Sequence, residues 1–257
     1  MTAAAFCRSC RQKGWLRMIR SISLFGHGIS LYYTLWFIGA VCVIVGGYFL
    51  GKKNGFGFAK SIFYVVGAVI LGYLLLWATS WVFGGGKTNG LNFVRIVTFM
   101  PLTILILALL FKDRFSKVSD FIAPLLAVFH GVTHLGCIFE GCCHGYPAQW
   151  GLFSNVVGTR CFPIQPIEAL SSIIIGLVLA RLFLQSRQQG KLYAWYLLLF
   201  GASRFLWEFL RDNEKIWHGI SELAFHALAA AVIGLAALII IQCCTQKECR
   251  VYEKDKI

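Results

Sequence analysis

Charged residues are scarce in this sequence. They make up 14% of its 257 residues, and only 11 of these are Asp or Glu, whereas roughly 25% of an average globular protein is charged. Hydrophobic residues reach 58%, and the mean hydropathy is +0.71. A soluble domain of this size could not bury so much apolar surface. The composition therefore excludes a soluble protein, a disordered chain, a collagen-like repeat and a secreted disulfide scaffold, and it predicts a membrane protein.

Several other signals are missing. The 10 cysteines are scattered, so they indicate no disulfide framework. The N-terminus has no compact apolar core that ends in a small-residue cleavage site, so we expect no cleaved signal peptide. The sequence shows no internal repeat of roughly 20–50 residues. Cys7 and Cys10 form a lone C-x-x-C, which is more often incidental than a metal or redox site.

Long apolar runs are present instead. A helix needs roughly 20 apolar residues to cross about 30 Å of hydrocarbon. Candidate spans cover residues 29–50, 61–83, 92–111, 121–139, 167–184, 192–209 and 223–244. The sequence therefore predicts an all-α integral membrane protein of about seven transmembrane helices, with residues 1–257 forming a single polytopic domain.

The distribution of basic residues predicts the orientation. Four connecting or terminal segments carry 12 Lys and Arg in all: 51–60, 112–118, 185–191 and 245–257. The alternate segments carry 4: 84–90, 139–166 and 210–221. The positive-inside rule places the basic 245–257 tail in the cytoplasm and the 139–166 loop outside. The basic N-terminal segment, 1–28, would favour the opposite orientation, and we give the internal loops more weight.

The richest polar group follows the fourth apolar run. His130, His134 and Cys137 are spaced i, i+4 and i+7, so they share one face of a helix. The chain then becomes glycine-rich and carries Glu140, Cys142, Cys143 and His144. Histidines spaced i, i+4 suit zinc or copper, but no repeated C-x-x-C pair supports a structural metal. The alternative for Cys142 and Cys143 is packing of small residues in a tight turn.

Two further polar groups lie in later spans. Arg204, Glu208 and Arg211 fall on one helical face, with Glu208 within reach of both arginines. A guanidinium fork suits bidentate binding of a phosphate; the alternative is an ion-paired helix end that extends to the interface. Gln165 and Glu168 lie around Pro166, which suits the first turn of a helix, so Glu168 alone predicts no more than a favourable anion at a helix start.

These groups, in this order, resemble the prolipoprotein diacylglyceryl transferase family. The segment from Asp120 to Pro124 and the following glycine-rich run are similar to the family's Asp-x-x-x-Pro and glycine-rich signature. Residues 163–169 match Pro-x-Gln-x-x-Glu-Ala, and residues 200–211 match the aromatic-Gly-x-x-Arg-Phe-x-x-Glu-Phe-x-Arg motif almost position for position. Tyr32 and Tyr33 stand near the place of an important family tyrosine.

The chain also departs from the family pattern. His134 replaces an arginine that is central to the family's activity, and Cys137 replaces the asparagine that usually follows. Phe162 stands where the family has a histidine before Pro163. No histidine lies between His27 and His130, so a histidine of the family's periplasmic loop is missing. The scaffold resemblance is therefore firmer than the resemblance in activity.

The resemblance implies a multi-pass enzyme of the bacterial inner membrane. Such an enzyme transfers a diacylglyceryl group from phosphatidylglycerol to the lipobox cysteine of a prolipoprotein, with no cofactor, metal or nucleic acid. Arg204 is the expected phosphate ligand, Glu208 fixes its geometry, His134 is a weaker cation or a general base, and Glu140 lines the cavity. The expected substrate-binding residues are Tyr33, His130, Cys137, Cys142, Cys143, His144, Gln165, Glu168 and Arg211.

Two other functions remain open at this point. The His/Cys cluster is compatible with a membrane protein of metal or thiol-redox chemistry. The arginine-bearing face is compatible with a phospholipid-binding protein that has no catalytic activity.

Overall fold

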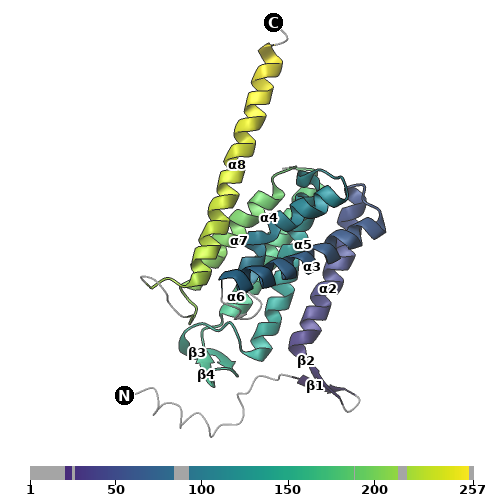
Figure 1. The fold of residues 1–257 in the computed structure, drawn as a ribbon. Helices are drawn as coiled ribbons and strands as arrows, with labels where there is room; N and C mark the ends of the chain where they lie inside the picture. The colour runs from purple at the N-terminus through teal and green to yellow at the C-terminus, as the bar shows by residue number, and fades with distance from the viewer. Residues whose placement is uncertain (1–20, 25–26, 84–92, 188, 214–218, 255–257) are drawn as a thin grey trace.

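The computed structural model describes residues 21–24, 27–83, 93–187, 189–213 and 219–254. Cys7, Cys10 and most of the basic N-terminal segment lie outside these ranges. The described part contains seven helices (Figure 1): α2 Leu31–Lys53, α3 Phe58–Phe83, α4 Phe93–Leu110, α5 Phe115–Glu140, α6 Ile164–Leu184, α7 Leu192–Glu208 and α8 Glu222–Lys254. Six of them are long and apolar enough to cross a membrane, and α7 has 17 residues. The predicted all-α membrane class is confirmed.

Several helices, though not α4 or α7, extend beyond the apolar runs that predicted them at one end or both. Helix α5 begins at Phe115, six residues before the predicted start of its run at 121, so Asp120 lies inside the helix. Helix α8 continues to Lys254, well past the predicted end at 244. An apolar run marks the part of a helix that lies within the hydrocarbon, whether it faces lipid or the other helices. The helix itself can continue into the polar interface because its backbone hydrogen bonds are internal.

Helix α5 is the centre of the bundle and packs against α2, α6 and α7, while α8 packs along α7 (Figure 1). Aromatic side chains fill much of the core around it, with Phe121 in edge-to-face contact with Phe56. The outer helix faces carry exposed apolar residues such as Phe37, Leu109 and Ile240. Exposed apolar surface of this kind is what lipid would cover.

Two small antiparallel hairpins lie outside the helices. One pairs β1 (Ser21–Leu24) with β2 (His27–Ser30). The other pairs β3 (Pro147–Ser154) with β4 (Thr159–Cys161) and lies within the long loop between α5 and α6. Gly151 permits the close approach of these two strands, because a Cβ there would lie 1.8 Å from the Cys161 carbonyl oxygen. Neither hairpin was predicted from the sequence, and β2 includes the first two residues of the span predicted at 29–50.

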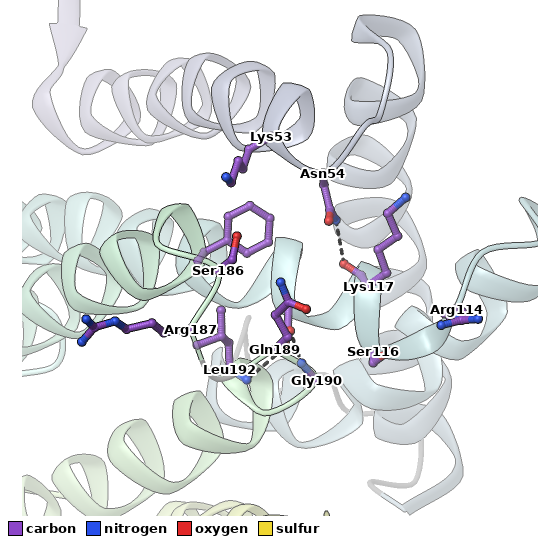
Figure 2. Close-up of a pocket in the computed structure, with 12 residues that line it drawn as sticks. Lys53, Asn54, Arg114, Ser116, Lys117, Ser186, Arg187, Gln189, Gly190 and Leu192 are labelled. Atoms are coloured by element: carbon purple, nitrogen blue, oxygen red, sulfur yellow. Dashed lines mark hydrogen bonds between the residues drawn. The ribbon is translucent and has the colours of Figure 1, made fainter.

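Asp120, near the N-terminal end of α5, connects this helix to the α6–α7 turn. Its carboxylate accepts the backbone N–H of Leu192 at 2.9 Å and that of Gly190, so it fastens the α6–α7 turn to α5. A cavity of about 300 Å³ lies beside it (Figure 2). Arg114 and Arg187 lie on opposite sides of this cavity and point away from each other, so their charges do not converge on a common ligand (Figure 2).

Candidate active site

Glu168 is the centre of a buried ionic network. Its side chain is 2% exposed and projects from the second turn of α6, which begins at Ile164. Arg211 donates to it from Nε at 3.0 Å and also from Nη2. Arg204 Nη1 lies 3.2 Å from Oε1, and His134 Nε2 lies 2.7 Å from Oε2. Three basic side chains from α5, α7 and the segment after α7 therefore meet on one carboxylate.

This arrangement corrects two expectations from the sequence. Glu208 pairs with Arg204 but not with Arg211; its other partners are Ser221 and Asn213. The reason is that α7 ends at Glu208, so Arg211 has left the helical face that the i, i+3 spacing assumed. Glu168, expected to be a simple helix-start anion, is the residue that both arginines share.

The network is closely balanced in charge. Two arginines face two glutamates, all four side chains are buried, and the cluster is net positive only when His134 is protonated. This set of side chains therefore carries no surplus of positive charge when His134 is neutral. Buried ion pairs carry a large desolvation cost, and removal of one partner leaves the other uncompensated.

His130 lies beside the network but is not part of it. Its Nδ1 is 2.8 Å from Ser172 Oγ on α6. Its ring stacks on Phe93 at 4.3 Å between centroids and on His134 at 5.0 Å. His130 therefore supports the orientation of the His134 ring from one side.

Thiols lie at the Nδ1 edge of the His134 ring. Cys137 Sγ lies 3.7 Å from His134 Nδ1. The ligand atoms of His134, Cys137 and Cys143 all lie within 4.8 Å of one another. Hydrogen bonds from Cys137 and Cys142 lower the pKa of Cys143 well below its usual value; burial opposes this effect, and the nearby Arg211 and His134 reinforce it.

The glycine-rich loop that carries Cys143 is held on several sides. Gln165 Nε2 donates to the Cys142 carbonyl at 3.0 Å, and Ser154 Oγ donates to the Gly141 carbonyl at 2.6 Å. Gly145 forms an antiparallel bridge with Arg211. A Cβ at Gly145 would lie 2.8 Å from the Leu210 carbonyl oxygen, so only glycine allows this approach. The loop therefore joins the ends of α5 and α7 around the site.

Comparison with known proteins decides the family. A family model described as prolipoprotein diacylglyceryl transferase matches residues 20–242. The chain belongs to this family. It is accordingly a membrane enzyme that transfers a lipid group.

Curated relatives of the diacylglyceryl transferase family cover most of the chain. The chain is 24% identical over 216 residues to "Phosphatidylglycerol--prolipoprotein diacylglyceryl transferase 2" of Clostridium perfringens, covering 75% of this chain and 82% of the relative. It is 28% identical over 210 residues to the transferase of Bordetella avium, covering 74% and 78%. It is 26% identical over 213 residues to that of a Marinomonas species, covering 73% and 76%.

The remaining predicted site residues of this diacylglyceryl transferase family member lie at the edge of the network. Glu140 is the last residue of α5 and is partly exposed. His144 places Nδ1 3.2 Å from the Gly145 carbonyl oxygen, which directs it to the backbone of its own loop. Tyr33 is 72% exposed. Tyr32 instead faces α5, where a Cβ at Gly136 would lie 3.1 Å from its ring.

Three polar partners were missed by sequence reasoning: Ser172, Asn213 and Ser221. None belongs to a motif with a chemical signature. Their only signal is their position in the chain: Ser172 lies one turn after Glu168, Asn213 lies two residues after Arg211, and Ser221 directly precedes α8. Hydroxyl and amide groups in such places are common, so the sequence could not single them out.

Proposed function

We propose that this protein transfers a diacylglyceryl group from phosphatidylglycerol to the cysteine thiol of a prolipoprotein, in the bacterial inner membrane. The observation that carries the proposal is the convergence of Arg204 and Arg211, 5% and 3% exposed, on Glu168. All three occupy the motif positions that resemble the family signature. The names of the curated relatives support both the donor and the acceptor.

The proposed reaction is a substitution at carbon. The acceptor sulfur, once it has lost its proton, attacks the glyceryl CH₂ carbon of the donor. A C–S bond forms while the C–O bond to phosphate breaks, and glycerol phosphate leaves with the electron pair. Negative charge grows on the departing phosphate oxygen, so fixed guanidinium donors would stabilise the transition state.

Arg204 is the better placed of the two arginines to receive the phosphate. Its contact with Glu168 is a single 3.2 Å approach, whereas Arg211 contacts both oxygens of that carboxylate. An entering phosphate oxygen could replace Glu168 at Arg204 while Glu208 still orients the guanidinium. Arg211 then acts as a positioning residue, which holds Glu168 through its side chain and the loop at Gly145 through its backbone.

His134 is the proposed base for the acceptor thiol. Its Nε2 faces Glu168, which orients the ring and favours a proton on that nitrogen. Its Nδ1 faces the thiol cluster and is therefore the atom available to accept a proton. This assignment gives the histidine a role different from that of the arginine it replaces in the family pattern.

The proposed orientation follows the basic loops. The α2–α3, α4–α5 and α6–α7 turns lie at the same end of the bundle as the far end of α8 (Figure 1). The β3–β4 hairpin lies at the opposite end (Figure 1). The positive-inside rule assigns the basic end to the cytoplasm, which puts the proposed site toward the periplasmic half of the membrane.

A transfer assay tests the function. Purified protein is mixed with phosphatidylglycerol vesicles and a lipobox peptide, and the products are measured by mass spectrometry. We expect a peptide that carries a thioether-linked diacylglyceryl group, together with released glycerol phosphate. Vesicles of phosphatidylethanolamine alone and a peptide with serine in place of the lipobox cysteine are the matched controls. Binding of phosphatidylglycerol without either product would support the phospholipid-binding alternative and overturn the proposal.

A further inference from the structure

We propose that His134, Cys137 and Cys143 form a binding site for a zinc ion, with a fourth coordination position open to an incoming thiol. The three ligands come from one turn of α5 and from the glycine-rich loop that follows it. Ion binding stands on this geometry alone. The identity of the incoming thiol, the acceptor cysteine, rests on the proposed function.

The spacing of the ligand atoms fits a tetrahedral ion. Zinc lies about 2.3 Å from thiolate sulfur and about 2.0–2.1 Å from imidazole nitrogen, which places sulfur and nitrogen about 3.6 Å apart at a tetrahedral angle. Cys137 Sγ and His134 Nδ1 are 3.7 Å apart. The other pairs lie within 4.8 Å, so a shift of about 1 Å in the side chains closes the set around one ion.

The second ring nitrogen of His134, Nε2, contacts a carboxylate, as is common in histidines that bind a metal. Nε2 lies 2.7 Å from Glu168 Oε2. A histidine that binds a metal commonly donates its other ring N–H to a carboxylate, which fixes the tautomer and the ring plane. Arg211 Nη2 also lies 3.1 Å from Nε2, and it donates to the same Glu168 oxygen. With the Nε2 proton donated to that shared oxygen, the lone pair of Nδ1 is available to the ion beside Cys137.

Cys143 is delivered by a backbone conformation that few residues adopt. Its φ is 56°, in the left-handed region that usually belongs to glycine. Non-glycine residues persist there when their surroundings hold them, and they cluster at functional sites. Here Gln165 fixes the neighbouring Cys142 carbonyl at 3.0 Å, and Gly141 before it has a φ of 79°. The loop thus aims the Cys143 side chain at α5.

The donor set also fits zinc chemically. Two thiolates balance the charge of a divalent ion, and a Cys₂His site with one open position is a catalytic zinc arrangement. An exogenous thiol that binds there loses its proton to solvent as the zinc–sulfur bond forms, because a coordinating thiol is deprotonated. With the ion bound, His134 Nδ1 is a ligand and no longer a base, so the ion takes over the activation of the thiol that the proposed function assigns to His134. The paired C-x-x-C spacing that the sequence lacks describes closed, four-ligand structural sites, and this site needs only three protein ligands.

Metal analysis of matched variants tests the proposal. The wild-type protein is purified in detergent under reducing conditions without chelator, and its zinc and copper contents are measured by mass spectrometry. We expect about one zinc per chain, lost in Cys137→Ser and in Cys143→Ser. Cys161→Ser is the control, since this buried thiol lies in β4 outside the cluster, and it should keep the zinc. Thermal unfolding of each variant shows that it is folded.

Cobalt gives a second readout. Replacement of zinc by Co²⁺ should produce thiolate-to-cobalt charge-transfer absorption in the wild type that is lost in both cluster variants. Absence of zinc in the wild type, or a wild-type zinc content in Cys137→Ser and Cys143→Ser, would overturn the site. Copper in place of zinc would overturn the choice of ion. A Cys137–Cys143 disulfide whose reduced form binds no zinc would overturn the proposal in favour of redox chemistry.

The two proposals fail separately. Arg204→Lys should lose transfer but keep its zinc, because Arg204 is not a ligand. Zinc bound to a wild-type protein that transfers no lipid would end the proposed function and leave the ion site standing. Transfer that continues at full rate in a protein shown to hold no zinc would end the ion proposal and leave the function standing.

Discussion

Arg211 and Glu168 form a two-point ion pair between residues 43 apart in the sequence, with Arg211 Nε 3.0 Å from Oε1 and Nη2 donating to Oε2. The pair ties the segment after α7 to the start of α6. Because Arg211 also bridges to Gly145 through its backbone, the same residue holds the thiol-bearing loop. One side chain and its own backbone thus link the ionic network to the cysteines.

Arg204 should be essential for transfer. Arg204→Lys keeps the charge but loses the planar fork, and Arg204→Ala loses both. We expect both variants to lose about 10²–10³-fold in turnover, the usual effect of removing one transition-state donor, while Arg204→Lys still inserts and folds. Transfer rates and thermal stability in detergent are the measurements. Full activity in Arg204→Ala would end the catalytic assignment.

Glu168 should be essential for stability. Glu168→Ala leaves the two arginines and His134 without their shared carboxylate, and breaking a buried ion pair costs about 3–5 kcal/mol. Glu168→Gln should be nearly as destabilising, because an amide cannot balance the charge. Glu140→Gln, on the partly exposed end of α5, is the matched control and should change stability by no more than about 0.5 kcal/mol. Unfolding by denaturant measures all three, and wild-type stability of Glu168→Ala would contradict the network.

Gly201 should tolerate no side chain. A Cβ there would lie 2.5 Å from Ala231 N and 2.6 Å from the Ala227 carbonyl oxygen, both of which are backbone atoms of α8. Gly201→Ala should therefore push α8 away from α7 and destabilise the protein by about 1–3 kcal/mol, as overpacking does. Gly57→Ala, where nothing lies within 4 Å, is the control. Equal melting temperatures for the two variants would argue against this close helix contact.

Asp113 should make stability depend on pH. Burial raises the pKa of its carboxyl, but hydrogen bonds from Lys60 and Tyr64 and the charges of Lys60 and Lys117 outweigh it, so the pKa lies below the usual 3.8. A lowered pKa contributes stability above the unfolded value, and this contribution is lost as the pH falls through the folded value. Thermal stability measured from about pH 6 down to about pH 3 should therefore fall more steeply in the wild type than in Asp113→Asn. If the stability of the wild type and of Asp113→Asn fell in parallel with pH, Asp113 would make no such contribution.

The orientation is open to a direct test. A reporter that is active only in the cytoplasm should be active when fused after Ile257, because the loops at that end of the bundle carry most of the basic residues. A fusion within the β3–β4 turn, near Gly158, should give the opposite reporter signal. Activity of a periplasm-specific reporter after Ile257 would reverse the orientation.

The helices could be predicted from the sequence because lipid imposes a simple requirement, an apolar run of sufficient length. Arg204, Glu208 and His134 could be named because ionisable groups in such runs stand out, and Arg211 because it continues the motif that follows Arg204. Their pairing could not be predicted. Arg211 pairs with Glu168 and not with Glu208, because α7 ends at Glu208 and Arg211 lies beyond the helix. The contact between α6 and α7 depends on tertiary packing, which the spacing of residues along one helix does not predict.

Helix α8 is much longer than its apolar part. Its 33 residues amount to about 50 Å at 1.5 Å per residue, whereas its apolar part, Glu222–Cys244, is 23 residues long. Its base is joined to the site, since Ser221 donates to Glu208 and Gly201 lies against Ala231. A tilt of about 5° at that base would move the far tip by about 4 Å. Because α8 packs along α7 through Gly201 and Ala231, a tilt that began around Glu208 would carry both helices together and would be felt at the far end of the bundle.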